Sequence, residues 1–175
     1  MKKSILITGC STGIGYVCAH ALQNEGFHVI ASCRKEQDVQ RLINEGLTCI
    51  KLDLNSPESI SSGVKQALEL AEGKLYAVFN NGAYGQPGAL EDLPTEALQD
   101  QFQTNFFGWH QLVREVLPHM RIQGEGRIIQ NSSVLGFAAM KYRGAYNASK
   151  FALEGWTDTL RLELADTNIK VALIE

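Results

Sequence analysis

Short apolar segments alternate with longer amphipathic segments along the whole 175-residue chain. Each apolar segment has the length of a β-strand, and the segment after it carries apolar residues at helical spacing. This alternation is typical of right-handed βαβ units, in which helices cover both faces of a parallel sheet. It predicts a single α/β domain over residues 1–175, a doubly wound, Rossmann-like sheet.

We expect strands at residues 4–8, 27–32, 48–52, 75–80, 127–132 and 169–174. Helices are expected between them, at residues 14–24, 36–44, 57–72, 95–120 and 145–165. Ser56, which precedes Pro57, and Thr95 are the expected N-caps of two of these helices, and Pro118 should bend the fourth helix. Glycines follow the first three helices, as is common at helix C-termini.

The composition is that of a globular protein, with 45% hydrophobic and 20% charged residues. The net charge is −3 and no block of like charge stands out, which argues against nucleic acid or an anionic membrane surface as the main partner. No apolar run approaches the roughly 20 residues that span a bilayer, so no membrane span is expected. The apolar run near the N-terminus is too short for a secretion signal, and we expect a cytoplasmic protein.

The cysteines are widely spaced, with no CxxC pair and no histidine at the spacing of a metal ligand. They are Cys10, Cys18, Cys33 and Cys49. In a cytoplasmic protein such cysteines are most simply small apolar residues. We therefore expect neither a structural disulfide nor a metal site.

A loop rich in glycine joins the first expected strand to the first helix, with the sequence T-G-C-S-T-G-I-G. Glycines allow the backbone to turn tightly and to approach a pyrophosphate, and the helix N-terminus offers free N–H groups to it. The hydroxyl groups of this loop are further donors. The loop predicts a dinucleotide site at Gly9, Ser11, Thr12, Gly13, Ile14 and Gly15, although a βα turn without a ligand would also use glycine.

The end of the second expected strand bears on which dinucleotide is bound. An acidic residue at that place accepts from the ribose 2′-OH of NAD, whereas arginine accommodates the 2′-phosphate of NADP. Here Arg34 and Lys35 follow the strand, and no carboxylate comes before Glu36. Two adjacent cations suit a dianionic phosphate, so we expect NADP rather than NAD, the alternative being a solvated basic pair.

Polar residues also follow the third and fourth expected strands. Asp53, next to Leu54, could accept from an adenine amino group or could cap the following helix. Asn80, Asn81 and Gly82 end the fourth strand at the same edge of the sheet, where they could satisfy backbone and ribose groups or form an ordinary turn. We expect these five residues to contribute to the cofactor site.

A tyrosine and a lysine share one face of the helix that follows the fifth expected strand. Tyr146 and Lys150 are four residues apart, and Ser133 lies at the end of that strand. A phenol serves as an acid or base near neutral pH only where a cation stabilises its phenolate, and Lys150 is placed to supply that cation. Ser133 can donate a hydrogen bond to a substrate oxygen. Each residue alone could be structural, but together after a dinucleotide loop they fit carbonyl reduction.

These motifs occur in the order T-G-x-x-x-G-x-G, N-N, N-x-x-G, S-S and Y-x-x-x-K. In this respect the whole chain resembles the short-chain dehydrogenase/reductase family. The resemblance implies that Tyr146 is the general acid/base and that Lys150 assists it and binds the nicotinamide ribose. It implies that Ser133, thirteen positions before Tyr146, polarises the carbonyl, and that Asn105 holds a proton-relay water. It also implies a homodimer or homotetramer through helices 95–120 and 145–165.

The chain departs from the family's pattern in two places. The family's N-N-A-G is replaced by N-N-G-A at residues 80–83, and the chain ends with the sixth strand, where the family continues with a substrate lid and a seventh strand. We therefore expect a fragment with a complete catalytic core. The pattern is closest to the retinol, hydroxysteroid and aldehyde reductase branch, which implies a bulky apolar carbonyl or alcohol substrate. Alternatives are an NADPH sensor without catalysis, an inactive fragment, and an epimerase that retains its cofactor.

Overall fold

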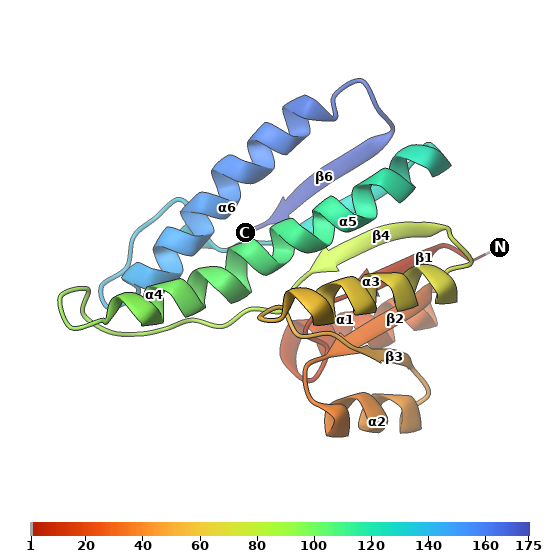
Figure 1. The fold of residues 1–175 in the computed structure, drawn as a ribbon, viewed down its shortest axis with the longest axis horizontal. Coiled ribbons are helices and arrows are strands. Elements are labelled where there is room, and N and C mark those ends of the chain that lie inside the picture. Colours follow the sequence, from red (N-terminus) through yellow and green to blue (C-terminus); the bar gives the residue numbers. More distant parts are fainter. Residues whose placement is uncertain (1) are drawn as a thin grey trace.

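The computed structural model describes residues 2–175, and its centre is a parallel sheet in the order β3-β2-β1-β4-β5-β6 (Figure 1). The strands are β1 Ser4–Ile7, β2 His28–Cys33, β3 Thr48–Lys51, β4 Leu75–Asn80, β5 Gly126–Asn131 and β6 Ile169–Ile174. Strand order reverses between β1 and β4, and a ligand of such a sheet binds beyond the carboxyl ends of the strands at this point. The predicted doubly wound fold is confirmed.

Helices connect successive strands on both faces of the sheet. They are α1 Gly13–Asn24, α2 Glu36–Asn44, α3 Pro57–Leu70, α4 Thr95–Phe102, α5 Gly108–Gln123 and α6 Gly144–Glu163. The N-cap prediction for Ser56 is confirmed, since its Oγ accepts from the Ser59 N–H at 3.2 Å. The prediction for Thr95 is wrong: Pro94 is the N-cap, and Thr95 is the first helical residue.

The predicted helix over residues 95–120 contains a π-helical segment, η1 Gln103–Phe107, between α4 and α5. The apolar spacing of 3.6 residues gave no signal of this widened turn. Such segments are rare and often occur at functional sites, and this one carries the buried Asn105. The helix then passes Pro118 and ends at Gln123, where Gly124 adopts a left-handed conformation with φ +82°.

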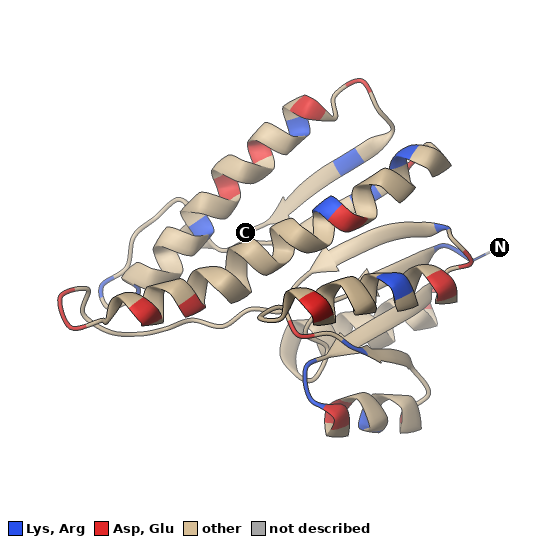
Figure 2. Ribbon diagram, viewed as in Figure 1, with Lys and Arg blue, Asp and Glu red and all other residues tan. Residues whose placement is uncertain are grey.

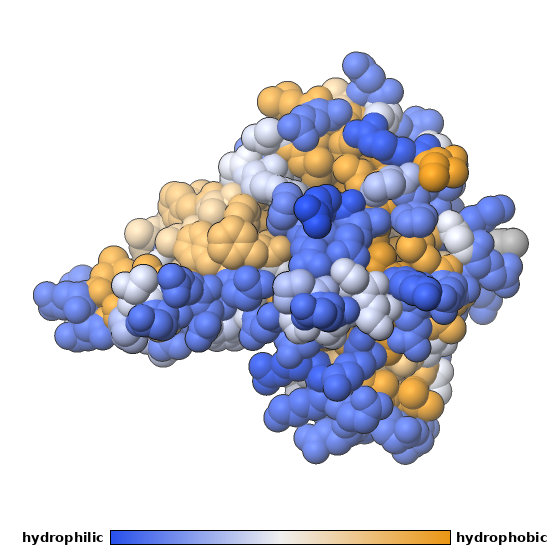
Figure 3. Space-filling model, in the orientation of Figure 1, coloured by the Kyte–Doolittle hydropathy of each residue, from blue (hydrophilic) through white to orange (hydrophobic). Residues whose placement is uncertain are grey.

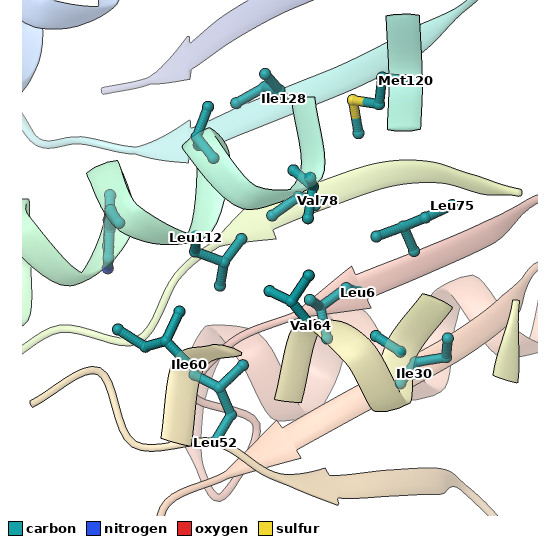
Figure 4. Packing of buried hydrophobic residues seen from close by; sticks show 14 of the residues in the cluster. Leu6, Ile30, Leu52, Ile60, Val64, Leu75, Val78, Leu112, Met120 and Ile128 are labelled. Atoms are coloured by element: carbon teal, nitrogen blue, oxygen red, sulfur yellow. The ribbon is translucent and has the colours of Figure 1, made fainter. Parts of the chain in front are cut away.

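Each face of the sheet has its own apolar core. Alternate strand residues point to opposite faces, so Leu6 packs with α3, α5 and α6, whereas its neighbours Ile5 and Ile7 pack with α1 and α2. Figure 4 shows the first of these cores, in which Val64 of α3 lies beside Leu6. The two cores fix the strands between the helix layers, and thereby fix the loops at the strand ends.

The four cysteines are free, and three of them are buried. Burial raises the pKa of the Cys10 thiol to about 12. Within residues 2–175 no three His, Cys, Asp or Glu side chains gather closely enough to hold a metal ion. In the same part of the chain, no helix is both long and apolar enough to cross a bilayer.

Candidate functional site

The Gly-rich loop after β1 packs against the turn after β4 at backbone distance. Gly9 has φ +69°, and a Cβ placed on it would lie 2.5 Å from the Gly82 Cα. A Cβ on Gly15 would lie 2.5 Å from the Gly9 carbonyl oxygen. Any side chain at these positions would push the two segments apart, so glycine is required for this close approach.

Hydrogen bonds with the turn after β4 hold the first half of the loop. The Asn81 amide Nδ2 donates to the carbonyls of Thr8 and Gly9 at 3.0 and 3.2 Å. The Thr8 hydroxyl Oγ1 accepts from the backbone N–H of Asn81 and of Gly82, each at 2.9 Å. Asn81 is therefore committed to fixing the loop, in addition to lining the cleft beside it.

A cleft of about 620 Å³ lies between the Gly-rich loop and the start of α6. It brings together residues predicted separately from three segments of the sequence. Its lining includes Gly9, Ser11, Thr12, Ile14, Asn81, Gly82 and Tyr146. Tyr84, Leu135, Met140 and Arg143, which carried no prediction from the sequence, also line this cleft.

A second cleft of about 570 Å³ lies over the carboxyl ends of β2 and β3. It contains Arg34, Asp53 and Leu54, and it meets the first cleft at shared residues of the loop and of the turn after β4. Figure 2 shows blue, basic residues on the segment between β2 and α2, and Arg34 of this segment lines the cleft. The Asp53 Oδ1 accepts from the Asn55 N–H at 3.0 Å, so this carboxylate also forms a local turn.

Lys150 is almost fully buried, with 1% of its surface exposed. Its Nζ donates to the Asn131 carbonyl at 2.6 Å and lies 4.4 Å from the centroid of the Trp109 ring and 5.6 Å from that of Tyr146. Burial lowers the pKa of Lys150 to about 8, and the Glu154 carboxylate, one helical turn further on, opposes this shift. The predicted Tyr–Lys pair thus shares one environment.

Asn105, Ser133 and Asn80 are among the predicted residues that line neither cleft. The buried Asn105 is held by the backbone of Tyr84, whose carbonyl accepts from the Asn105 Nδ2 at 2.8 Å. Ser133 caps the short helix η2 Val134–Gly136, and its Oγ accepts from the Leu135 N–H at 3.1 Å. The amide of Asn80 is buried in the sheet and donates to the Gln130 Oε1 at 2.8 Å.

The two joined clefts fit a dinucleotide. The closely packed backbone at the glycines separates a cleft that contains Arg34 from a cleft that contains Tyr146. These two clefts could hold the adenosine and nicotinamide ends of such a molecule. Gly13, the first residue of α1, with φ +62°, and Gly15 allow this backbone to reach a pyrophosphate at the helix N-terminus. Lys35 is exposed beside Arg34.

A family model described as short chain dehydrogenase matches residues 3–175. The chain belongs to this family. It is 49% identical over 175 residues to the uncharacterized oxidoreductase YbbO of Escherichia coli K12, covering 100% of the chain and 65% of that protein. It is 37% identical over 183 residues to retinol dehydrogenase 8 of Homo sapiens, covering 99% of the chain and 58% of that protein.

Solved structures of the short-chain dehydrogenase family share this fold. The crystal structure of an actinorhodin polyketide ketoreductase variant with NADPH superposes with a TM-score of 0.93 at 30% identity, covering 98% of the chain and 69% of that structure. The chain spans 65% of the length of YbbO and 58% of the length of retinol dehydrogenase 8.

Three residues of the site carried no signal that the sequence analysis recognised. The Trp109 Nε1 donates to the Gly82 carbonyl at 2.9 Å, and the same ring packs on Lys150. The Asn131 carbonyl binds Lys150, and Glu154 accepts from the Ser132 hydroxyl. The interval of four residues between Lys150 and Glu154 could have suggested that this carboxylate lies near the lysine, but no interval suggested the contacts of Trp109 or Asn131.

Proposed function

We propose that the protein is an NADP-dependent oxidoreductase that interconverts a carbonyl compound and an alcohol. The observation that carries this proposal is the single cleft lined by both the Gly-rich loop and Tyr146, with the Lys150 ammonium buried behind the tyrosine ring. The bound nicotinamide would supply or accept the hydride. Relatives such as YbbO are longer than this chain, so the proposal concerns the chain's own residues.

The chain's own groups would handle the proton and the substrate oxygen. In the direction of reduction, the Tyr146 hydroxyl gives its proton to the substrate oxygen, and it takes that proton back in the direction of oxidation. Ser133 donates a hydrogen bond to the same oxygen. The Lys150 ammonium, 5.6 Å from the centroid of the Tyr146 ring, would attract the negative charge that forms on the tyrosine oxygen when the proton leaves. Asn105 would hold a water for proton relay.

The preference for NADP rests on two basic residues at the second cleft. Arg34 lines the second cleft, and Lys35 is the next residue along the chain. The guanidinium of Arg34 and the ammonium of Lys35 suit a ribose 2′-phosphate. Two carboxylates, Asp53 and Asp100, also line this cleft, and Asp53 accepts from the Asn55 backbone. NADPH in the related ketoreductase structure agrees with this preference.

The substrate is expected to be bulky and apolar. Leu135 and Met140 line the first cleft, and Val134 and Phe137 are exposed next to it. Exposed apolar side chains that surround a cleft mark a binding surface. Retinol, named in the relative retinol dehydrogenase 8, is an alcohol of this kind.

A homodimer or homotetramer is proposed through α4, α5 and α6. Figure 3 shows a pale orange, apolar patch between α4 and α6. Phe107, the last residue of η1, and Phe151 of α6 are exposed, at 50% and 47%, whereas Leu160 and Leu164 further along the chain are buried in the core. Sedimentation analysis of Phe107→Asp should show a monomer where the unchanged protein is an oligomer.

The proposed function is tested with Tyr146→Phe in the full-length protein. Turnover of a panel of aldehydes and ketones should fall by about 10³-fold or more, because the acid/base hydroxyl is lost. NADPH binding should change little, since the aromatic ring is kept. Retention of turnover would contradict the proposal.

A further inference from the structure

We propose that Arg41 is a positioning residue, which holds the Gly-rich loop in the shape that receives the cofactor. Arg41 lies on α2, outside the lining of both clefts, and its guanidinium Nη2 donates to the backbone carbonyl of Ser11 at 2.6 Å. The inference rests on the proposed function, because it concerns the same cofactor site.

The two halves of the loop are held by different parts of the molecule. On the β1 side, the Cys10 N–H donates to the Ser32 carbonyl at 2.9 Å, and Asn81 binds two loop carbonyls. On the α1 side, within residues 2–175, the bond from Arg41 is the one side-chain hydrogen bond to the backbone of residues 11–13. Loss of Arg41 would therefore release the half of the loop that leads into α1.

Arg41 is itself fixed between α1 and α2. Its Nη1 donates to the Glu45 Oε1 at 3.0 Å, and the other oxygen of Glu45 lies 3.2 Å from the His20 Nε2 on α1. The guanidinium also lies 5.6 Å from the centroid of the Tyr16 ring. An exposed ion pair alone contributes little to stability. Here the ion pair with Glu45 orients the planar guanidinium of Arg41 towards the Ser11 carbonyl, so its contribution is to position the loop.

The glycines make this loop flexible, so a hydrogen bond that restrains it has an effect on its shape. Gly9 and Gly13 have φ values of +69° and +62°, and glycine is freer than any other residue to leave such a conformation. A loop that must be ordered on binding weakens affinity, whereas a loop that is already ordered does not. The bond from Arg41 would remove part of that cost before the cofactor arrives.

The proposal separates Arg41 from Arg34. The loop backbone would contact the pyrophosphate, which NADPH and NADH have in common, so Arg41 should affect both cofactors by the same factor. Arg34 would contact the 2′-phosphate, which only NADPH carries. The ratio of the two affinities therefore distinguishes a positioning residue from a phosphate ligand.

The test is a titration of Arg41→Gln with NADPH and with NADH, in the full-length protein. We expect both Kd values to rise by about fivefold through lost pre-organisation, with the NADPH preference and kcat at saturating cofactor unchanged. Arg41→Lys should recover part of the loss, because an ammonium can still donate to the Ser11 carbonyl. Arg121→Gln, an exposed arginine in the last turn of α5, is the matched control and should change neither Kd.

A thermal melt of each variant separates a loosened loop from a lost fold, and Arg41→Gln should melt close to the unchanged protein. Glu45→Gln should reproduce part of the effect, and the double variant should be no weaker than Arg41→Gln alone. Unaltered Kd values in Arg41→Gln, a loss confined to NADPH, or additive effects with Glu45→Gln would each overturn the inference. An unchanged protein that binds neither cofactor would instead overturn the proposed function.

Discussion

The segments that follow β1 and β5 begin at the same edge of the sheet, but different interactions determine their shapes. After β1, the loop depends on backbone contact, with Gly9 and Gly15 packed where no Cβ fits. After β5, the site depends on buried side chains, with Lys150 1% exposed beside the fully buried Ser149. One region is shaped by the absence of side chains and the other by their burial.

This difference separates what the two regions do for the protein. The Gly-rich loop contributes no charged side chain from its glycines. Its role is to present backbone N–H groups to a phosphate. A buried lysine lowers stability, because its ammonium gives up water for a carbonyl and an aromatic ring. Changes in the first region should therefore impair folding and cofactor binding, and changes in the second should impair chemistry.

The largest effect is expected for Lys150→Met. Methionine keeps an apolar chain of similar shape but removes the ammonium, so turnover should fall by a factor of about 10²–10⁴. Urea denaturation should show equal or greater stability, since a buried ammonium is replaced by an apolar group. A variant that is much less stable than the unchanged protein would contradict the comparison between the two regions.

The same variant makes a prediction about pH. Lys150 has a pKa of about 8 in the folded protein, below its ordinary 10.5. Below pH 8 Lys150 is charged in both the folded and the unfolded state, and the folded state carries the full free-energy cost of burying the ammonium. Between pH 8 and 10.5 the unfolded state binds more protons, so the stability of the unchanged protein should rise with pH. Relative to Lys150→Met, the gain should reach at most about 3 kcal/mol.

A smaller effect is expected for Gly15→Ala. The added Cβ would lie 2.5 Å from the Gly9 carbonyl oxygen and from the Asn81 Nδ2. Overpacking of this kind costs about 1–3 kcal/mol of unfolding free energy, and NADPH binding should weaken about tenfold or more. Gly155→Ala is the control, because a Cβ on this helical glycine meets nothing within 4 Å and should raise stability by about 0.5–1 kcal/mol.

The smallest effect is expected for Glu154→Gln. Its carboxylate opposes the lowering of the Lys150 pKa, so its removal should lower that pKa further. Titration of the Lys150 side chain by NMR measures the shift, and Glu163→Gln, near the end of the same helix, should leave it unchanged. An upward shift in Glu154→Gln would show that the carboxylate does not act through its charge.

The fold and the positions of the main candidate residues were predictable because they depend on local spacing. The alternation of apolar and amphipathic segments predicted the βαβ units of the sheet. The interval of four residues placed Tyr146 and Lys150 on one face of α6. The Gly-rich loop was recognisable because the close approach of Gly9 and Gly15 excludes other residues.

Contacts between distant segments were not predictable in the same way. The indole of Trp109 reaches Gly82, and Arg41 reaches Ser11, through packing that no interval in the sequence encodes. The π-helical turn at Asn105 widens a helix without changing its apolar pattern enough to be seen. Thr95 was a plausible cap by residue type, but the chain turns into the helix one residue earlier, at Pro94.

The measurement that tests the account most directly is a parallel titration of the protein with NADPH and NADH. Energy transfer from tryptophan to the reduced nicotinamide reports binding, because Trp109 donates to the backbone of Gly82, which lines both clefts. The account predicts that NADPH binds at least tenfold more tightly and that Arg34→Gln removes this difference. Equal affinities in the unchanged protein, a preference for NADH, or binding of neither cofactor would contradict it.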